Sequence, residues 1–198
     1  KLLEDIKGKI ILVTGAGGSI GSELCQQIHR LKPKLLILLE QNEYNLFKIS
    51  SQLKENILPS LTDIKDSSKM EEILRKFKPD YIFHTAALKH ITFVETDPIE
   101  ALHTNFLATV KLCQLCKFLK IKKMVFISTD KAVNPLNIMG ASKRLCEKYI
   151  QKIASKEKDT LFTIVRFGNV LGSTGSVVPV FEKQISEGGP VKITHPKI

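Results

Sequence analysis

Several residue types that a nucleic-acid-binding protein would use are scarce in this chain of 198 residues. It has no tryptophan and only three tyrosines, and no basic run is interleaved with aromatic residues. Proteins that bind single strands stack bases on aromatic side chains within a basic groove, so these absences argue against a nucleic-acid partner. The formal net charge is +10, with lysines dense over residues 111–158, which instead favours a small phosphorylated anion.

Long apolar segments are also missing. No stretch of eighteen apolar residues occurs, so no segment is long enough to cross a bilayer as a helix. No secretory signal opens the chain, which points to the cytoplasm. The sequence begins with Lys1 rather than methionine, and this favours a fragment of a longer protein.

A metal site has no support in the cysteine spacing. Cys113 and Cys116 form a lone CxxC, without a second CxxC or a histidine partner for zinc. The surrounding LCQLCKF has the pattern of an amphipathic helix, so both thiols lie on one helical face. We therefore expect buried thiols in a reducing compartment, and no metal.

Apolar runs and helical patterns alternate along the chain. Continuous apolar strands that alternate with helices predict a parallel sheet covered on both faces, a Rossmann-type, doubly wound α/β fold. The predicted strands cover residues 9–14, 34–40, a short segment ending near 61, 81–87 (running into a loop), 123–128 and 161–167. The predicted helices cover residues 19–31, 43–54, 70–77, 98–119 and 140–154.

A glycine-rich loop, VTGAGGSIG at residues 13–21, follows the first predicted strand directly. Gly15, Gly18 and Gly21 would allow a tight turn, a close approach to a pyrophosphate and close helix packing. The N–H groups at the start of the next helix would then face the phosphates. The loop therefore predicts a bound dinucleotide, contacted also by Gly17, Ser19 and Ile20.

The acid that ends the second strand, Glu40, indicates which dinucleotide is bound. Its carboxylate can accept hydrogen bonds from ribose hydroxyls and would repel a 2′-phosphate, so NAD is favoured over NADP. The alternative is that Glu40 is only a solvated strand end. Asp63 and Ile64 follow the third strand, where they would contact the adenine, and the small Ala86 and Ala87 leave room for the cofactor.

The composition changes after residue 167. Residues 168–198 are rich in glycine, proline and serine, with one short helix predicted near 180–187. We expect an NAD-binding domain over residues 1–167. The remainder, 168–198, would begin a substrate-binding lobe that this chain leaves incomplete.

Several collinear motifs resemble a known family. TGxxGxxG, HTAALKH (84–90) and STDK (128–131), followed by a lysine on the next helix, resemble extended short-chain dehydrogenase/reductases. Within that superfamily, TAALKH, STDKAVNP, NIMGASKR, VRFGNVLGSTGSV and GGPVKITHP resemble bacterial polysaccharide-biosynthesis nucleotide-sugar dehydratases. The resemblance runs from Leu3 to Pro196 and implies 4,6-dehydration of UDP-N-acetylglucosamine with NAD.

That reaction oxidises sugar carbon 4, eliminates water across carbons 5 and 6, and returns hydride to carbon 6. Elimination needs an acid and a base side by side, and Asp130 and Lys131 at a strand end supply such a pair. By resemblance Asp130 is the acid at carbon 6, Lys131 is the base at carbon 5, and Thr129 hydrogen-bonds the carbon 4 oxygen. Substrate contacts are expected from Lys89, Asn169 and Val170.

Met139 and Lys143 are four residues apart, so they share one face of a predicted helix. The wider superfamily carries a catalytic tyrosine and a ribose-binding lysine at this spacing, and Lys143 keeps the second role. Met139 has no ionisable group. Two interpretations stay open: a dehydratase in which another group, such as Asp130 through a water, accepts the proton, or a catalytically inactive NAD-binding module. A methionine-bearing branch of these dehydratases favours the first.

A nucleotide-sugar 4-epimerase of the same fold is a further alternative. Epimerases need no acid–base pair for elimination and depend on the tyrosine, so Asp130 and Lys131 argue against it. The stereochemistry at carbon 5 is left open. Asn105 is expected to support the strand that carries Ser128.

The resemblance also bears on assembly and location. The helices at 98–119 and 140–154 resemble those that pair at dimer interfaces, which implies a homo-oligomer, a dimer or higher. The opening LEDIKGK resembles the junction at which long members join a membrane-spanning region to the catalytic domain. A membrane anchor outside this chain would place the full-length protein at the cytoplasmic face of the inner membrane.

Overall fold

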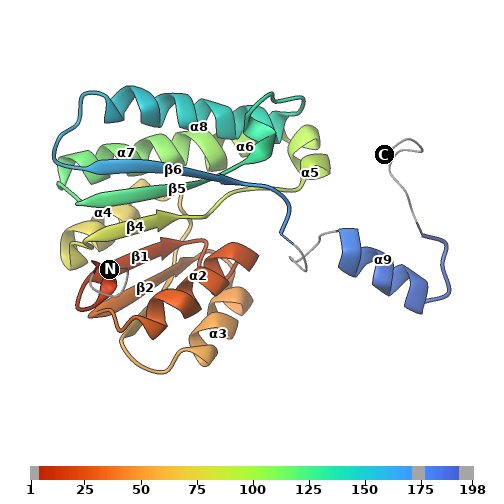
Figure 1. Cartoon of the computed structure of the whole chain (residues 1–198), viewed down its shortest axis with the longest axis horizontal. Coiled ribbons are helices and arrows are strands. Elements are labelled where there is room, and N and C mark those ends of the chain that lie inside the picture. Colours follow the sequence, from red (N-terminus) through yellow and green to blue (C-terminus); the bar gives the residue numbers. More distant parts are fainter. Residues whose placement is uncertain (1–4, 171–176, 192–198) are drawn as a thin grey trace. The chain divides into compact units, whose positions relative to one another are not determined.

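A computed structural model describes residues 5–170 and 177–191 (Figure 1). Its centre is one six-stranded sheet in the order β3-β2-β1-β4-β5-β6, with every neighbouring pair parallel. The strand order reverses between β1 and β4, and open α/β sheets bind ligands at such a switch point. The strands are β1 (Ile10–Thr14), β2 (Leu35–Glu40), β3 (Ile57–Leu61), β4 (Tyr81–His84), β5 (Lys123–Thr129) and β6 (Leu161–Phe167).

Helices cover both faces of this sheet, as Figure 1 shows. Successive side chains of a strand point to opposite faces, so Ile11 and Val13 join one buried cluster and Leu12 joins the other. The first cluster is closed by α2 (Ser19–Arg30) and α3 (Glu43–Gln52). The second is closed by α4 (Ser67–Phe77), α7 (Ala108–Phe118) and α8 (Ile138–Ala154). The predicted doubly wound fold is confirmed.

Polar side chains define where three of these helices begin. Asn42 accepts a hydrogen bond from the N–H of Asn45 at the start of α3, and Asp66 does the same for Lys69 at the start of α4. Asn137 accepts from the N–H of Gly140 at the start of α8. Such caps satisfy N–H groups that have no partner within the helix. The cap at Asn137 explains why α8 begins before residue 140, the predicted start.

The segment between β4 and α7 differs from the predicted single helix over 98–119. It contains α5 (Ile91–Thr96), α6 (Pro98–Ala101) and a π-helical turn, η1 (Leu102–Leu107), before α7. The short helix α5 was not predicted because its β-branched and aromatic residues have low helix propensity. The π-turn contains Asn105, whose side chain contacts Leu88 and Ser142, and no local pattern predicts these contacts.

The chain divides into two units, Lys1–Gly168 and Asn169–Ile198. The second contains α9 (Val177–Ser186). The division lies beside the boundary expected at residue 167, and the assignment of the second unit to a substrate-binding lobe stays a prediction. The motif residues 171–176 and His195 lie outside the described residues.

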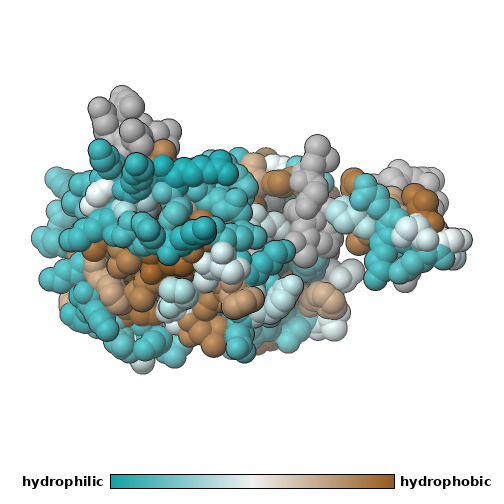
Figure 2. All heavy atoms as spheres, turned by 90° about the horizontal axis from the view of Figure 1, so that it is seen from below, coloured by the Kyte–Doolittle hydropathy of each residue, from teal (hydrophilic) through white to brown (hydrophobic). Residues whose placement is uncertain are grey.

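The surface is a mixture of polar side chains and exposed apolar side chains. Figure 2 shows a largely hydrophilic face with apolar side chains gathered in patches. Large apolar side chains that are exposed include Tyr44 and Phe47 of α3 and Leu61 of β3. Among the residues that the structure describes, no helix is long and apolar enough to cross a membrane. Cys113 and Cys116 are buried, as predicted, with each sulfur 3.8 Å from the Met124 sulfur.

Candidate active site

The glycine loop lies at the carboxyl ends of β1 and β4, at the switch point of the sheet. Gly15 has a φ of +66°, a conformation that favours glycine. A Cβ at Gly21 would lie 2.0 Å from the carbonyl oxygen of Gly15, so only glycine allows α2 to start this close to the loop. Within the described residues, no side chain caps α2 at Gly18, and its first N–H groups remain suited to an anion.

Glu40 is part of the same loop structure and is not a solvated strand end. It is buried, and one carboxylate oxygen accepts a hydrogen bond from the N–H of Gly17 at 3.0 Å. The other oxygen accepts from Gln41 and Asn42, also at 3.0 Å. A carboxylate has about four acceptor positions, so capacity for ribose hydroxyls remains. The ribose contact itself stays a prediction.

A cleft of about 60 Å³ lies beside this loop. It brings together several residues that the sequence analysis assigned to the cofactor, from four separate segments of the chain. A small-residue wall, a buried carboxylate and a glycine turn are what the adenosine half of a dinucleotide requires. The cleft is lined by Gly15, Leu39, Glu40, Gln41, Thr62, Ile64, Ala86, Ala87, Leu88 and Thr104.

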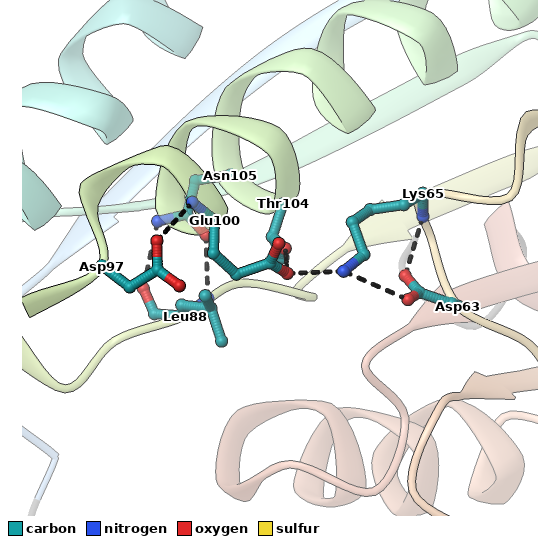
Figure 3. A network of polar contacts seen from close by, with 7 residues as sticks. All are labelled: Asp63, Lys65, Leu88, Asp97, Glu100, Thr104 and Asn105. Carbon is teal, nitrogen blue, oxygen red and sulfur yellow. Dashed lines mark hydrogen bonds and ion pairs between the residues drawn. The ribbon is translucent and has the colours of Figure 1, made fainter. Parts of the chain in front are cut away.

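Asp63 is not among the lining residues, and Figure 3 shows what it contacts instead. Its carboxylate accepts from the N–H of Lys65 at 2.9 Å and lies 3.4 Å from the Lys65 ammonium. Lys65 also donates to Glu100, which accepts from the Thr104 hydroxyl at 3.0 Å. The hydrogen bond to Glu100 raises the pKa of Lys65 and lowers that of Glu100. An ion pair thus joins the segment after β3 to α6, and the adenine contact of Asp63 stays a prediction.

One end of the Ala86–Leu88 loop is held by a buried hydrogen-bond chain through His84. The His84 ring is fully buried, with Nδ1 2.7 Å from the Thr14 hydroxyl and Nε2 2.9 Å from the Thr109 hydroxyl. Burial lowers the pKa of His84 to about 3, so the ring is neutral. The Thr109 hydroxyl donates to the Asn105 carbonyl, so it accepts from Nε2–H of His84. Thr14 therefore donates to Nδ1 and accepts from the N–H of Ala86 at 3.3 Å.

The other end of the loop is held by Asn105. Its side chain accepts from the N–H of Leu88 at 2.8 Å and donates to the Leu88 carbonyl at 3.0 Å (Figure 3). It also lies 3.0 Å from the Ser142 hydroxyl of α8. The expectation that Asn105 supports the strand carrying Ser128 is therefore wrong. Asn105 joins the cofactor-side loop to α8, because the π-turn directs its side chain there.

The predicted acid–base pair lies at the end of β5, in a short 3₁₀ turn, η2 (Asp130–Ala132). The Thr129 hydroxyl donates to a carboxylate oxygen of Asp130 at 2.9 Å, and the Lys131 ammonium lies 3.2 Å from the same oxygen. These two hydrogen bonds, that of Thr129 first, lower the pKa of Asp130. The structure brings the three residues together with Asp130 ionised and half-exposed.

Lys143 and Met139 are both buried on α8, beside this turn. The Lys143 ammonium donates to the Ile127 carbonyl at 2.8 Å and lies 4.4 Å from the centre of the Phe126 ring. Burial lowers the pKa of Lys143 to about 8. Met139 packs with Val94 and Ala101 in a small apolar cluster. Its side chain therefore contributes packing at the position where a tyrosine would contribute a hydroxyl.

A buried carboxylate that the sequence analysis missed, Glu147 of α8, contacts the strand that leads to the acid–base pair. It contacts the Ser128 hydroxyl and two guanidinium groups, those of Arg144 and Arg166. The local signal that could have found it is its spacing, because Glu147 follows Lys143 by one helical turn on the same face.

Three residues were predicted from the sequence to contact the substrate. Lys89 is exposed in the segment that precedes α5. Asn169 and Val170 belong to the second unit. The roles of these residues toward a sugar nucleotide stay predictions.

Comparisons with known proteins agree on a family. The family described as "Polysaccharide biosynthesis protein" matches residues 11–198. The chain is 44% identical to the capsular polysaccharide biosynthesis protein CapD of Staphylococcus aureus, over 98% of this chain and 33% of that protein. It is 36% identical to a UDP-N-acetylglucosamine 4,6-dehydratase (inverting) of Campylobacter jejuni, over 91% of this chain and 55% of that protein. The chain is 33% identical to a UDP-glucose 4-epimerase of Rickettsia bellii, over 96% of this chain and 57% of that protein.

A solved structure shows the same fold. The X-ray structure of Pen from Bacillus thuringiensis matches with a TM-score of 0.90 and 35% identity, and covers 96% of this chain and 61% of that chain. The present chain therefore spans only part of each of these proteins.

Proposed function

Because this chain belongs to the family of polysaccharide biosynthesis proteins, within the extended short-chain dehydrogenase/reductase superfamily, we propose that the full-length protein is a UDP-N-acetylglucosamine 4,6-dehydratase. The observation that carries the proposal is the contact between Asp130 and Lys131 at the end of β5. The next α-helix along the chain, α8, carries the buried Lys143. A carboxylate and an amine in contact are the groups that an elimination of water requires. The identity to a dehydratase of that substrate supports the same conclusion.

We propose NAD as the cofactor, held by the glycine loop, Glu40 and Lys143. The lysine would donate to the nicotinamide ribose, and the buried carboxylate of Glu40 disfavours a 2′-phosphate. Bound NAD would take hydride from sugar carbon 4 and return it to carbon 6. The remaining steps are proton transfers and the loss of the carbon 6 oxygen as water, and the chain's own residues must perform the proton transfers.

The hydrogen bonds of Asp130 suggest how a site without the tyrosine completes these transfers. Asp130 starts as a carboxylate, because the Thr129 and Lys131 hydrogen bonds favour its ionised form. The Thr129 hydroxyl, which donates to Asp130, passes it the proton of the carbon 4 hydroxyl. Asp130 is then the acid that protonates the carbon 6 hydroxyl, which leaves as water.

Lys131, which contacts Asp130 as an ammonium, would first release a proton to solvent and then complete the cycle as an amine. It removes the proton from carbon 5 during the elimination and later returns a proton to the same carbon. Two protons are taken up and two are given back, so both residues end in their starting forms. Met139 takes no part in this cycle and only fills space beside α5 and α6.

Product analysis by NMR tests the proposal. The full-length enzyme should convert UDP-N-acetylglucosamine to a 4-keto-6-deoxy sugar without accumulation of NADH. A matched Asp130→Asn variant should bind NAD and form the product about 10² to 10⁴ times more slowly. A product with an inverted carbon 4 and an intact carbon 6 hydroxyl would overturn the proposal.

A 4-epimerase is the second candidate, favoured by the 33% identity to the enzyme of Rickettsia bellii. Epimerisation needs only reversible oxidation at carbon 4 and leaves carbons 5 and 6 untouched. It gives no role to the Asp130–Lys131 contact. Solvent deuterium separates the two reactions, because only the dehydratase should incorporate it at carbon 5.

A further inference from the structure

Glu147 is buried without solvent exposure in the middle of α8. One carboxylate oxygen accepts from the Ser128 hydroxyl at 2.6 Å and from Nε of Arg166 at 2.7 Å. The other oxygen accepts from Arg166 at 2.5 Å and from Arg144 at 2.9 Å. Burial alone would raise the pKa of Glu147, but the hydrogen bonds of Arg166, Ser128 and Arg144 lower it to about 2. The group is therefore a fully hydrogen-bonded carboxylate.

Three separate elements meet at this carboxylate. Ser128 and Arg166 face each other in the register of β5 and β6, and Glu147 belongs to α8. Ser128 is the residue directly before Thr129. Glu147 thus connects α8 to Ser128, the next-to-last residue of β5 before the acid–base turn.

A second contact of the same kind lies one helical turn away. Lys143 donates to the carbonyl of Ile127, the neighbour of Ser128. Two consecutive residues of β5, Ile127 and Ser128, therefore form hydrogen bonds with two residues of α8 that lie one helical turn apart. These two hydrogen bonds hold the strand end to the helix at two points, in addition to the pairing of Ser128 and Thr129 with β6.

We propose that Glu147 is a positioning residue, which through Ser128 fixes where Thr129, Asp130 and Lys131 lie relative to Lys143. The proposed reaction requires Thr129, Asp130 and Lys131 around the sugar ring and Lys143 at the nicotinamide ribose, so these groups must keep fixed relative positions. Groups that hold catalytic residues in place are themselves held by buried hydrogen bonds, and errors of about 1 Å cost large factors in rate. This positioning role rests on the proposed function, because the residues that are positioned are those of the proposed reaction.

Loss of the Ser128 contact and loss of the Arg144 contact of Glu147 are expected to have different effects. The Ser128 contact leads to the acid–base turn. The Arg144 contact is the outer one, because the Arg144 side chain is 31% exposed and lies on α8 itself. Loss of the Ser128 hydroxyl should therefore cost rate, whereas loss of the Arg144 guanidinium should cost stability.

The test compares Ser128→Ala with Arg144→Met in the full-length enzyme. Ser128→Ala should lower kcat by about 10- to 100-fold, the range known for supporting residues at metal sites, with KM and NAD affinity little changed. Its Tm should fall no further than that of Arg144→Met, because each variant removes hydrogen bonding to the same buried carboxylate. Arg144→Met should lower the Tm and keep kcat. Glu147→Gln should lower both, and it adds to the test only where it folds.

Two outcomes would overturn the inference. One is a Ser128→Ala enzyme with a wild-type kcat. The other is a loss of kcat that follows the loss of Tm across all variants, because a purely structural role predicts that order.

Failure of the proposed function is recognised separately. If the wild type gives no dehydrated product, that function is wrong, and crystal structures then decide the inference. In the Ser128→Ala structure, a displacement of residues 129–131 relative to Lys143 supports it. Unchanged positions refute it.

Discussion

The carboxylate of Glu40 accepts a hydrogen bond from the N–H of Gly17 at 3.0 Å, across the turn between β1 and α2. The residue predicted to select the cofactor therefore also holds the loop that is proposed to bind its phosphates. Charge selection and loop geometry cannot be changed independently at this position.

The first prediction concerns that coupling. Glu40→Gln replaces one acceptor by an NH₂ group that faces backbone N–H groups, so it should weaken NAD binding by about tenfold or more, the equivalent of about 1.4 kcal/mol. NADP binding should weaken less, because the repulsion of its 2′-phosphate is also removed. Calorimetric titration measures both affinities, and Glu43→Gln on the exposed start of α3 is the matched control. Tighter binding of NADP than NAD by the wild type would contradict the assignment of Glu40.

The second prediction concerns the acid–base pair. Asp130→Asn and Lys131→Ala should each lower kcat by about 10² to 10⁴, because positioned acids and bases contribute factors of that size. The measurement is the turnover of the full-length enzyme with UDP-N-acetylglucosamine. Near-normal rates in both variants would mean that the chemistry lies elsewhere.

The third prediction concerns Met139. Met139→Ala should destabilise the protein by about 2–5 kcal/mol, the usual cost of truncating a buried methionine. Met139→Leu should cost much less, because it keeps the volume that contacts Val94 and Ala101. Denaturant unfolding measures the stabilities, and the folded fraction of each variant should keep its turnover. A large loss of kcat in a stable Met139→Leu variant would show a direct catalytic role.

The fourth prediction concerns the pH dependence of stability. Burial lowers the pKa of Lys143 from 10.5 to about 8 in the folded protein. Between these values the unfolded chain binds a proton that the folded chain does not. The contribution of Lys143 to the free energy of unfolding should therefore rise with pH in this window, by about 1.4 kcal/mol per pH unit.

Denaturant unfolding of the wild type and of Lys143→Met, without cofactor, measures this contribution as a difference. Other titrating groups cancel in the comparison. The stability of the wild type relative to the variant should increase from pH 8 to 10.5 and stay level below pH 8. A difference in stability that does not change over the whole pH range would show that the pKa of Lys143 is not lowered in the folded protein.

The fifth prediction concerns His84. Its hydrogen-bond chain requires a neutral ring with the proton on Nε2. Nitrogen NMR should show that tautomer without titration between pH 5 and 8, and the signal should vanish in His84→Gln. A titration in that range would contradict the buried chain from Ala86 to Asn105.

The sheet and the glycine loop could be predicted because their signals are local. Ile11 to Val13 form a continuous apolar run, and Gly15, Gly18 and Gly21 follow it at once. The contact between Asp130 and Lys131 could also be predicted, because the two residues are neighbours in the sequence. Glu40 was correctly placed at the end of β2, yet its bond to Gly17 depends on a loop geometry that no pattern shows.

The buried polar contacts could not be predicted in the same way. Ser128, Glu147 and Arg166 come from three elements, and only the stacking of α8 on β5 and β6 joins them. Asn105 shows the same limit, because its direction depends on a turn with π-helical hydrogen bonds inside an apparently regular helix. Short-range periodicity describes the faces of helices and strands, but pairs of polar groups far apart in sequence are chosen by the packing of whole elements.

The π-turn at Leu102–Leu107 makes chain length a constraint in this part of the protein. A π-turn contains one residue more than an α-turn, and each residue of an α-helix turns the chain by about 100°. Deletion of one residue here would leave an unbroken helix of ordinary appearance. It would also rotate everything before it around the helix axis, so that Glu100 could no longer face Lys65 while Asn105 faces Leu88. Substitutions in this segment alter single contacts, whereas a change in residue number would misalign the two sides of the cofactor cleft at once.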